Sequence, residues 1–177
     1  SLQKAEWHIA PDGGARLVYS YVFNGVVDLM GVKFDLPETE VKHKEWLGCG
    51  PYRVWKNRIH GPQLGVWAND YNDPVPGESF DYPEFKGYFA GVQWMKLQTR
   101  TGMITICPGT DKDYVGVYQP RDGRDQLLYT LPETGISMMQ VIPAVRNKVN
   151  TTDLNGPSAQ PVWANGSYTG EVTLHFD

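Results

Sequence analysis

Glycine and proline interrupt this chain so often that long helices have little room to form. Of its 177 residues, 19 are glycine and 13 are proline, and they break the sequence about every eight to fifteen residues. Apolar residues at helical spacing are almost absent, whereas alternation of apolar and polar residues is frequent. Short strands between closely spaced turns are typical of all-β folds. We therefore predict a single all-β domain over residues 1–177, a large antiparallel β-sandwich.

Two stretches show the alternation most clearly. In "WHIAPDGGARLVYSYVF" a Pro-Asp-Gly-Gly turn separates two strands, and "SYTGEVTLHF" near the end of the chain alternates in the same way. Each has one apolar face that we expect to cover a core. Asn24-Gly25 predicts a further turn, followed by a strand in "VVDLMGVKFDL". The residues expected on the apolar faces are Leu17, Tyr19, Tyr21, Phe23, Tyr168, Val172, Leu174 and Phe176.

Two segments are less regular. "LPETEVKHKEWLG" has helix-like ends, but its apolar residues form no helical stripe, so a strand is favoured over a helix. Residues 146–166 are polar and rich in Asn and Pro, and we expect a long loop there, which in a compact domain is often a functional surface.

Charge and composition exclude several classes of partner. The formal net charge is only −4 and both signs are interspersed, so no basic stripe for nucleic acid is present. No apolar run is long enough to predict a membrane span. Cys49 and Cys107 lack metal-ligand spacing, which leaves a disulfide or two free thiols open and predicts neither a metal nor a cofactor.

The stretch "WLGCGPYRVWKNR", residues 46–58, gathers aromatic and cationic side chains around turn residues. Gly and Pro punctuate its first half, and Tyr52, Arg53, Trp55 and Arg58 follow in quick succession. We interpret it as a loop that presents side chains, with packing of Trp55 beneath the loop as the alternative. Trp46 and Trp94, flanked by strand-like sequence, are expected in the core.

"GVKFDLPETEVKHKEWLGCGPYRVWKNR" resembles a signature of the family 2 glycoside hydrolases of the β-galactosidase type, G-x-x-(F/L)-x-L-P, a strand, and then W-(L/Y)-G-x-G-P-x-E-N-Y-x-D-R. "FDYPEFKGYFAGVQWMKLQTRTGMITI" is similar to that family's next block, Y-x-x-P-Q-E-x-G-x-R-x-D-V-R-W-x-x-L. The terminal "GSYTGEVTLHF" resembles the last strand of the same domain. The resemblance implies the C-terminal domain of such enzymes, a galactose mutarotase-like supersandwich that lies beside the catalytic barrel and lines the rim of its active site.

The chain departs from the family pattern at the positions nearest the substrate. Where the family has E-N-Y-x-D-R, this chain has Arg53, Trp55 and Asn57 in place of Glu, Tyr and Asp, and it keeps Arg58. The local charge is therefore inverted, which suggests a ligand with a carboxylate, such as a uronic acid. The predicted carbohydrate partner is thus a galactoside or a uronic-acid-containing glycan.

These observations predict a carbohydrate-binding accessory domain that supports the catalytic barrel of a parent glycoside hydrolase and is not catalytic by itself. A periplasmic or extracellular location is favoured for that parent enzyme. A free-standing carbohydrate-binding module is one alternative. An aldose epimerase using Glu84 and His60 is another, suggested only by the fold relationship. The residues predicted to contact carbohydrate are Tyr52, Arg53, Trp55, Arg58, Trp67 and Glu84.

Overall fold

The computed structural model describes residues 1–36, 41–70, 87–117, 135–145 and 149–177. Strands hold 62% of these residues and helices 4%, so the prediction of an all-β fold is confirmed. The helical part consists of two short 3-10 turns, η3 (Thr152–Leu154) and η4 (Pro157–Ala159).

The larger sheet has seven strands in the order β1-β2-β10-β7-β6-β4-β5, and each pairs antiparallel with its neighbours. The last strand along the chain, β10, therefore lies in the middle of the sheet, between β2 and β7. The strands are β1 (Leu2–Ile9), β2 (Ala15–Val27), β4 (Val41–Gly50), β5 (Gln63–Asp70), β6 (Trp94–Thr99), β7 (Met103–Pro108) and β10 (Val162–Phe176).

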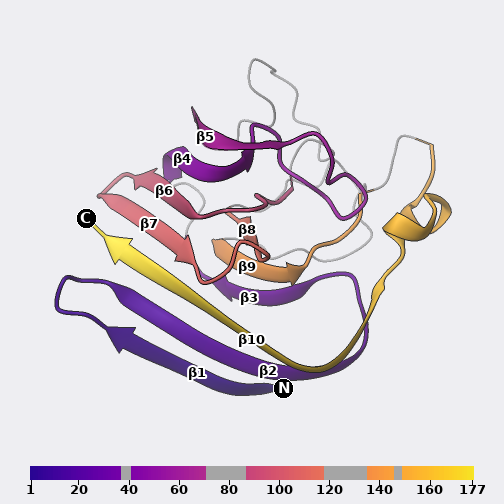
Figure 1. The fold of residues 1–177 in the computed structure, drawn as a ribbon, viewed down its shortest axis with the longest axis horizontal. Helices are drawn as coiled ribbons and strands as arrows, with labels where there is room; N and C mark the ends of the chain where they lie inside the picture. The colour runs from indigo at the N-terminus through magenta and orange to yellow at the C-terminus, as the bar shows by residue number, and fades with distance from the viewer. Residues whose placement is uncertain (37–40, 71–86, 118–134, 146–148) are drawn as a thin grey trace.

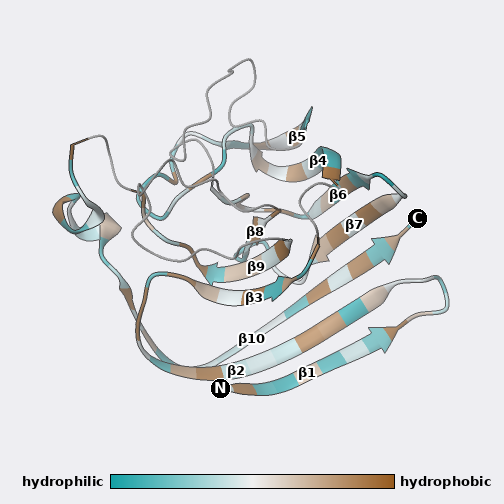
Figure 2. Ribbon diagram, turned by 180° about the vertical axis from the view of Figure 1, so that it is seen from behind, coloured by the Kyte–Doolittle hydropathy of each residue, from teal (hydrophilic) through white to brown (hydrophobic). Residues whose placement is uncertain are grey.

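The smaller sheet has three antiparallel strands in the order β3-β9-β8. In Figure 1 the large sheet curves around this small sheet, with β1, β2 and β10 on one side of it and β4, β5 and β6 on the other. Figure 2 shows the same two-layer arrangement from behind. The strands are β3 (Met30–Phe34), β8 (Tyr114–Gly116) and β9 (Ile136–Val141).

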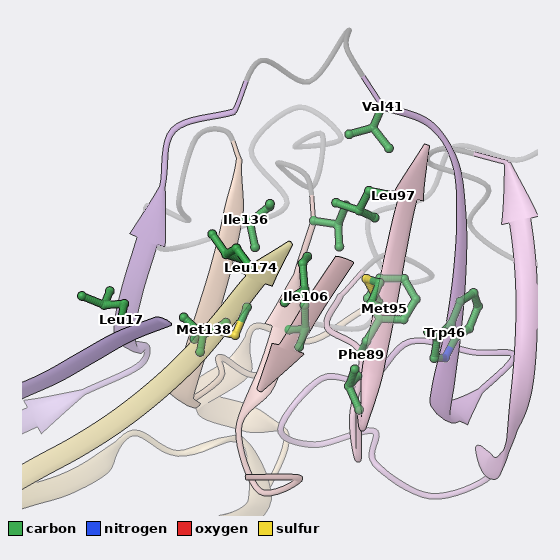
Figure 3. Packing of buried hydrophobic residues seen from close by; sticks show 14 of the residues in the cluster. Leu17, Val41, Trp46, Phe89, Met95, Leu97, Ile106, Ile136, Met138 and Leu174 are labelled. Atoms are coloured by element: carbon green, nitrogen blue, oxygen red, sulfur yellow. The ribbon is translucent and has the colours of Figure 1, made fainter. Parts of the chain in front are cut away.

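The main core fills the space between the two sheets (Figure 3). Leu174 and Ile106 reach it from the large sheet, and Ile136 and Met138 from the small one. Trp46 is fully buried there and packs edge-on against Phe89, with ring centroids 4.8 Å apart, as predicted for a core tryptophan. Trp94 is only half-buried, because its strand position faces the outer surface, where Lys96 lies over its ring.

Several local predictions are confirmed and others are wrong. The hairpin of β1 and β2 and the strand at 41–50 are present as predicted. Asn24-Gly25 does not turn the chain: Gly25 adopts a φ of 145° within β2, which continues because both residues pair with β10. The predicted loop at 146–166 ends early, since β10 begins at Val162 and extends alongside the far end of β2.

Candidate functional site

The predicted side-chain-presenting loop, residues 46–58, is mostly not a loop of that kind. Residues up to Gly50 belong to β4, and the aromatic residue on which the prediction rests is buried: Trp55 has none of its surface exposed. It packs edge-on against Tyr88, with ring centroids 6.1 Å apart, in a second core cluster. The expectation of an exposed Trp55 is therefore wrong, and the alternative of packing beneath its own loop holds.

Hydrogen bonds fix segment 51–58 against two distant parts of the chain. The backbone of Val54 exchanges two bonds with Tyr88, of 2.8 and 2.9 Å. The Asn57 side chain donates to the Val145 carbonyl at 2.8 Å and accepts from the Val145 N–H at 2.9 Å. Because its backbone and side chains are held in this way, the segment closes one part of the core.

The other predicted contacts are scattered. Arg53 is buried, with its guanidinium 5.8 Å from the centre of the Phe89 ring, whereas Tyr52 and Arg58 are exposed. Trp67, on β5, is half-buried against the main core and lies directly on Gly50, where a Cβ atom would come within 2.6 Å of its ring. Glu84 lies outside the described residues, so of the pair that the epimerase alternative requires the structure places only His60, which is exposed.

A different group of aromatic residues reaches the surface between the two sheets. Tyr19 and Tyr21 lie on one face of β2, and Tyr168 of β10 is the cross-strand partner of Tyr21. Their rings stack in series, with centroids 6.4 Å apart for the first pair and 5.6 Å for the second. Tyr19 is buried, while the other two are half-buried. We call these three residues the tyrosine stack.

Glycine makes the stack possible. Gly170 faces Tyr19 across the β2–β10 ladder, and a Cβ atom at that position would lie 2.3 Å from the Tyr19 hydroxyl oxygen. Any larger residue would displace the phenol, so the absent side chain of Gly170 defines where the Tyr19 ring sits.

Polar groups from the small sheet meet the stack. The Tyr21 hydroxyl donates to Gln140 Oε1 at 2.5 Å, and Gln140 Nε2 donates to the Thr169 carbonyl at 2.7 Å. Tyr114 of β8 is the partner of Met139 of β9, and Asp113 directly precedes β8 at this end of the ladder. The Tyr21 phenol and the Gln140 amide therefore meet where β2 and β9 approach each other, and Asp113 lies at the start of β8, the neighbour of β9.

Burial alters the acidity of this group. Asp113 is only 5% exposed, and loss of solvation raises the pKa of its carboxyl to about 6. Burial, with a smaller contribution from the charge of Asp113, raises the pKa of Tyr21 to about 12 and that of Tyr19 further still. Both phenols are therefore neutral donors throughout the physiological range.

This arrangement combines half-buried aromatic faces with a few directional polar groups. Aromatic rings bury apolar surface of a ligand, and the amide and carboxyl exchange hydrogen bonds with its polar edge. Such a pairing suits a ligand that has one apolar face and several hydroxyl groups.

Other candidate sites are less complete. A hollow of about 280 Å³ on the outer face includes His8, Arg16 and His175, but Arg16 is 3.5 Å from Glu171 and His8 is 3.3 Å from Glu6, so the hollow has no clear excess of positive charge. Within the described ranges, no three His, Cys, Asp or Glu side chains converge as metal ligands, and both cysteines are free. No helix in the described part of the chain has the length and apolar character needed to cross a membrane.

The sequence does not single out this candidate site, because its aromatic residues lie at positions typical of a core. The alternation predicts that Tyr19, Tyr21 and Tyr168 cover a core, and Tyr19 does. Nothing in "TDKDYVGV" marks Asp113 as a buried acid. The one available signal is the spacing of Tyr19 and Tyr21, which places two phenols side by side on one strand face.

Comparison with known proteins gives no family for this chain. No protein-family model matches the sequence, and no curated protein matches it at a significant level.

Proposed function

We propose that this domain binds carbohydrate at the tyrosine stack and serves as a non-catalytic accessory module of a glycoside hydrolase. The observation that carries the binding proposal is the series Tyr19, Tyr21 and Tyr168 beside Gln140 and Asp113. A pyranose ring has an apolar C–H face and a rim of hydroxyl groups, and the stack with its polar neighbours complements both.

The link to a glycoside hydrolase rests on the sequence resemblance of residues 31–58 and 80–106. A retaining glycosidase needs two carboxyl groups about 5 Å apart. In the family 2 glycoside hydrolases, which this sequence resembles, a separate barrel supplies them. The described residues of this chain all belong to one β-sandwich and its connections. The proposed role is therefore to hold part of a glycan near a catalytic domain that other sequence provides.

The test measures sugar binding with a matched pair of variants. Titration calorimetry with methyl β-galactoside should give saturable binding, and Tyr168→Ala should weaken it about five- to tenfold, the loss expected for one aromatic contact of about 1 kcal/mol. Tyr52→Ala is the control, because Tyr52 is 49% exposed but lies on segment 51–58.

Each outcome of this titration decides between surfaces. If Tyr52→Ala weakens binding and Tyr168→Ala does not, the ligand lies on segment 51–58 and the stack is the wrong site. If the unmodified domain binds neither methyl β-galactoside nor methyl β-glucuronide, the carbohydrate proposal itself fails.

A further inference from the structure

The two edge strands of the large sheet differ in charge. β1 and β5 are its outer strands, and among the strands that the structure describes each pairs with a single neighbour (Figure 1). β1 reads LQKAEWHI and carries Lys4 and Glu6 near its middle. Charged side chains on an edge strand oppose its pairing with another chain. β5 reads QLGVWAND, and its only charged residue, Asp70, stands at its last position. β5 therefore lacks the protection that β1 has.

The outer face of β5 is apolar and exposed. Leu64 is 70% exposed and Val66 is 61% exposed. Val66 is the cross-strand partner of Leu47 on β4, and Leu47 is the partner of Trp94 on β6. Leu47 and Trp94 are half-buried. We call these four residues the apolar strip; it crosses three strands and ends at the edge of the sheet. Apolar surface beside an unprotected edge strand marks a site of protein association.

The edge of β5 selects an extended backbone as its partner. Alternate residues of an edge strand point their N–H and C=O groups away from the sheet, and an added strand completes the ladder. A second β5 fits this edge in an antiparallel pair centred on Val66. On the outer face Val66 then lies opposite its own copy and Leu64 opposite Ala68, and on the inner face Gly65 lies opposite Trp67. Within this pairing no charged residues oppose each other and no two large rings are directly opposed.

We propose that β5 pairs antiparallel with β5 of a second copy of this chain, about a two-fold axis that passes between the two Val66 residues. The pairing joins the two large sheets into one and continues the apolar strip from one copy to the next. A two-fold axis uses the same edge on both copies, so the assembly closes as a dimer. The tyrosine stack lies on β2 and β10, so this interface does not depend on sugar binding.

The first experiment measures the dimer by sedimentation velocity between about 1 and 100 μM protein. The unmodified domain should shift from monomer to dimer over this range. Val66→Lys places two ammonium groups opposite each other and should raise the dimer Kd by more than about tenfold. Ala5→Lys is the matched control, because Ala5 is an exposed residue of the other edge strand. It should leave the Kd unchanged.

The second experiment tests the register by oxidative cross-linking in a domain whose two cysteines are replaced by serine. Val66→Cys should form a disulfide-linked dimer, because residues directly opposite in an antiparallel pair have Cα atoms about 4.5 to 5.5 Å apart, within reach of a disulfide. Leu64→Cys alone should not cross-link, since the two copies of Leu64 lie four residues, about 13 Å, apart along the ladder. A mixture of Leu64→Cys and Ala68→Cys domains should cross-link to each other.

Three results would overturn the proposal. One is an unmodified domain that stays monomeric over the whole concentration range. Another is a dimer that survives Val66→Lys and is lost in Ala5→Lys, which would place the interface on β1. The third is cross-linking of Leu64→Cys alone as readily as Val66→Cys, which would mean that the apolar strips pack face to face. The substituted residues of β5 are exposed, and circular dichroism checks that each variant is folded.

Discussion

Segment 51–58 and the tyrosine stack contain the same kinds of side chain and use them in opposite ways. Trp55 is fully buried and part of a core cluster, whereas Tyr21 and Tyr168 keep part of their rings exposed. The segment looks like a binding loop in sequence because aromatic and cationic residues follow turn residues. The stack looks like a core face because its residues alternate in regular strands. What decides each role is the element that lies opposite.

Trp55 is covered by apolar residues from later parts of the chain. Tyr88, Met139, Ile142 and Val145 surround its ring in the second core cluster. Opposite the stack lies the polar side chain of Gln140, on the central strand β9 of the small sheet. An aromatic ring that apolar side chains cover therefore stabilises the core. A ring that borders polar groups and stays partly exposed can contact a ligand.

The largest effect expected from this comparison is on stability. Trp55→Ala should reduce the free energy of unfolding by about 3 to 5 kcal/mol, because it leaves a cavity in the second core cluster. For a domain of this size that corresponds to a fall of roughly 10 °C in Tm. Thermal melts followed by circular dichroism measure it.

Trp55→Phe is the matched control for that substitution. The indole N–H of Trp55 has no hydrogen-bond partner within the described residues, so replacement by another aromatic ring removes volume but no hydrogen bond that the structure shows. Its loss should be clearly smaller than that of the alanine variant. A Trp55→Ala domain that melts with the unmodified one would mean that the ring is not part of the core.

A smaller effect is expected from the side chain that anchors the segment. Asn57→Ala removes both bonds to Val145, whose N–H and carbonyl are buried. Leaving such groups unsatisfied should cost about 1 to 3 kcal/mol. Urea unfolding at constant m-value gives this quantity directly. Sugar binding by the folded fraction should be unchanged, since Asn57 lies outside the tyrosine stack. A loss of sugar affinity in Asn57→Ala would mean that segment 51–58 and the tyrosine stack act as one binding site.

The smallest effect is expected one residue further on. The Arg58 side chain is exposed and makes no hydrogen bond or ion pair in the described part of the chain, although its backbone pairs with Trp55. Arg58→Ala should therefore change the free energy of unfolding by less than about 0.5 kcal/mol and leave sugar affinity unaltered. A marked loss of affinity would instead support the prediction from sequence that this arginine contacts carbohydrate.

The sequence predicts the fold class well because its signals are local. Turn residues and alternation mark the β1–β2 hairpin and β10 without reference to any partner. They fail where tertiary pairing overrides them, as at Asn24-Gly25, which pairs with β10 and does not turn. Lys44 shows the same limit: it occupies an inward position of β4, fully buried, and its Nζ donates to the Asp70 carbonyl at 2.7 Å.

The site depends on contacts that no local pattern encodes. Gln140 reaches Tyr21 across 119 positions of the chain, and this contact forms because the small sheet packs inside the curve of the large one (Figure 1). A single sequence gives the strand faces but not which faces meet. That is why the predicted contacts concentrate on segment 46–58 and do not include Tyr19, Tyr21 or Tyr168.

The central place of β10 in the large sheet has a consequence for how the domain is made. During translation the β1–β2 hairpin emerges first, but among the described strands its only other neighbour in the sheet is β10, which follows all the rest. Until those residues leave the ribosome, the nascent hairpin and the β7-β6-β4-β5 group have no described ladder in common. Because this pairing closes a very long loop, it adds entropy cost that local strands avoid. The large sheet can therefore be completed only once β10 has been synthesised. Until then, the β1–β2 hairpin is not paired with the other strands of that sheet.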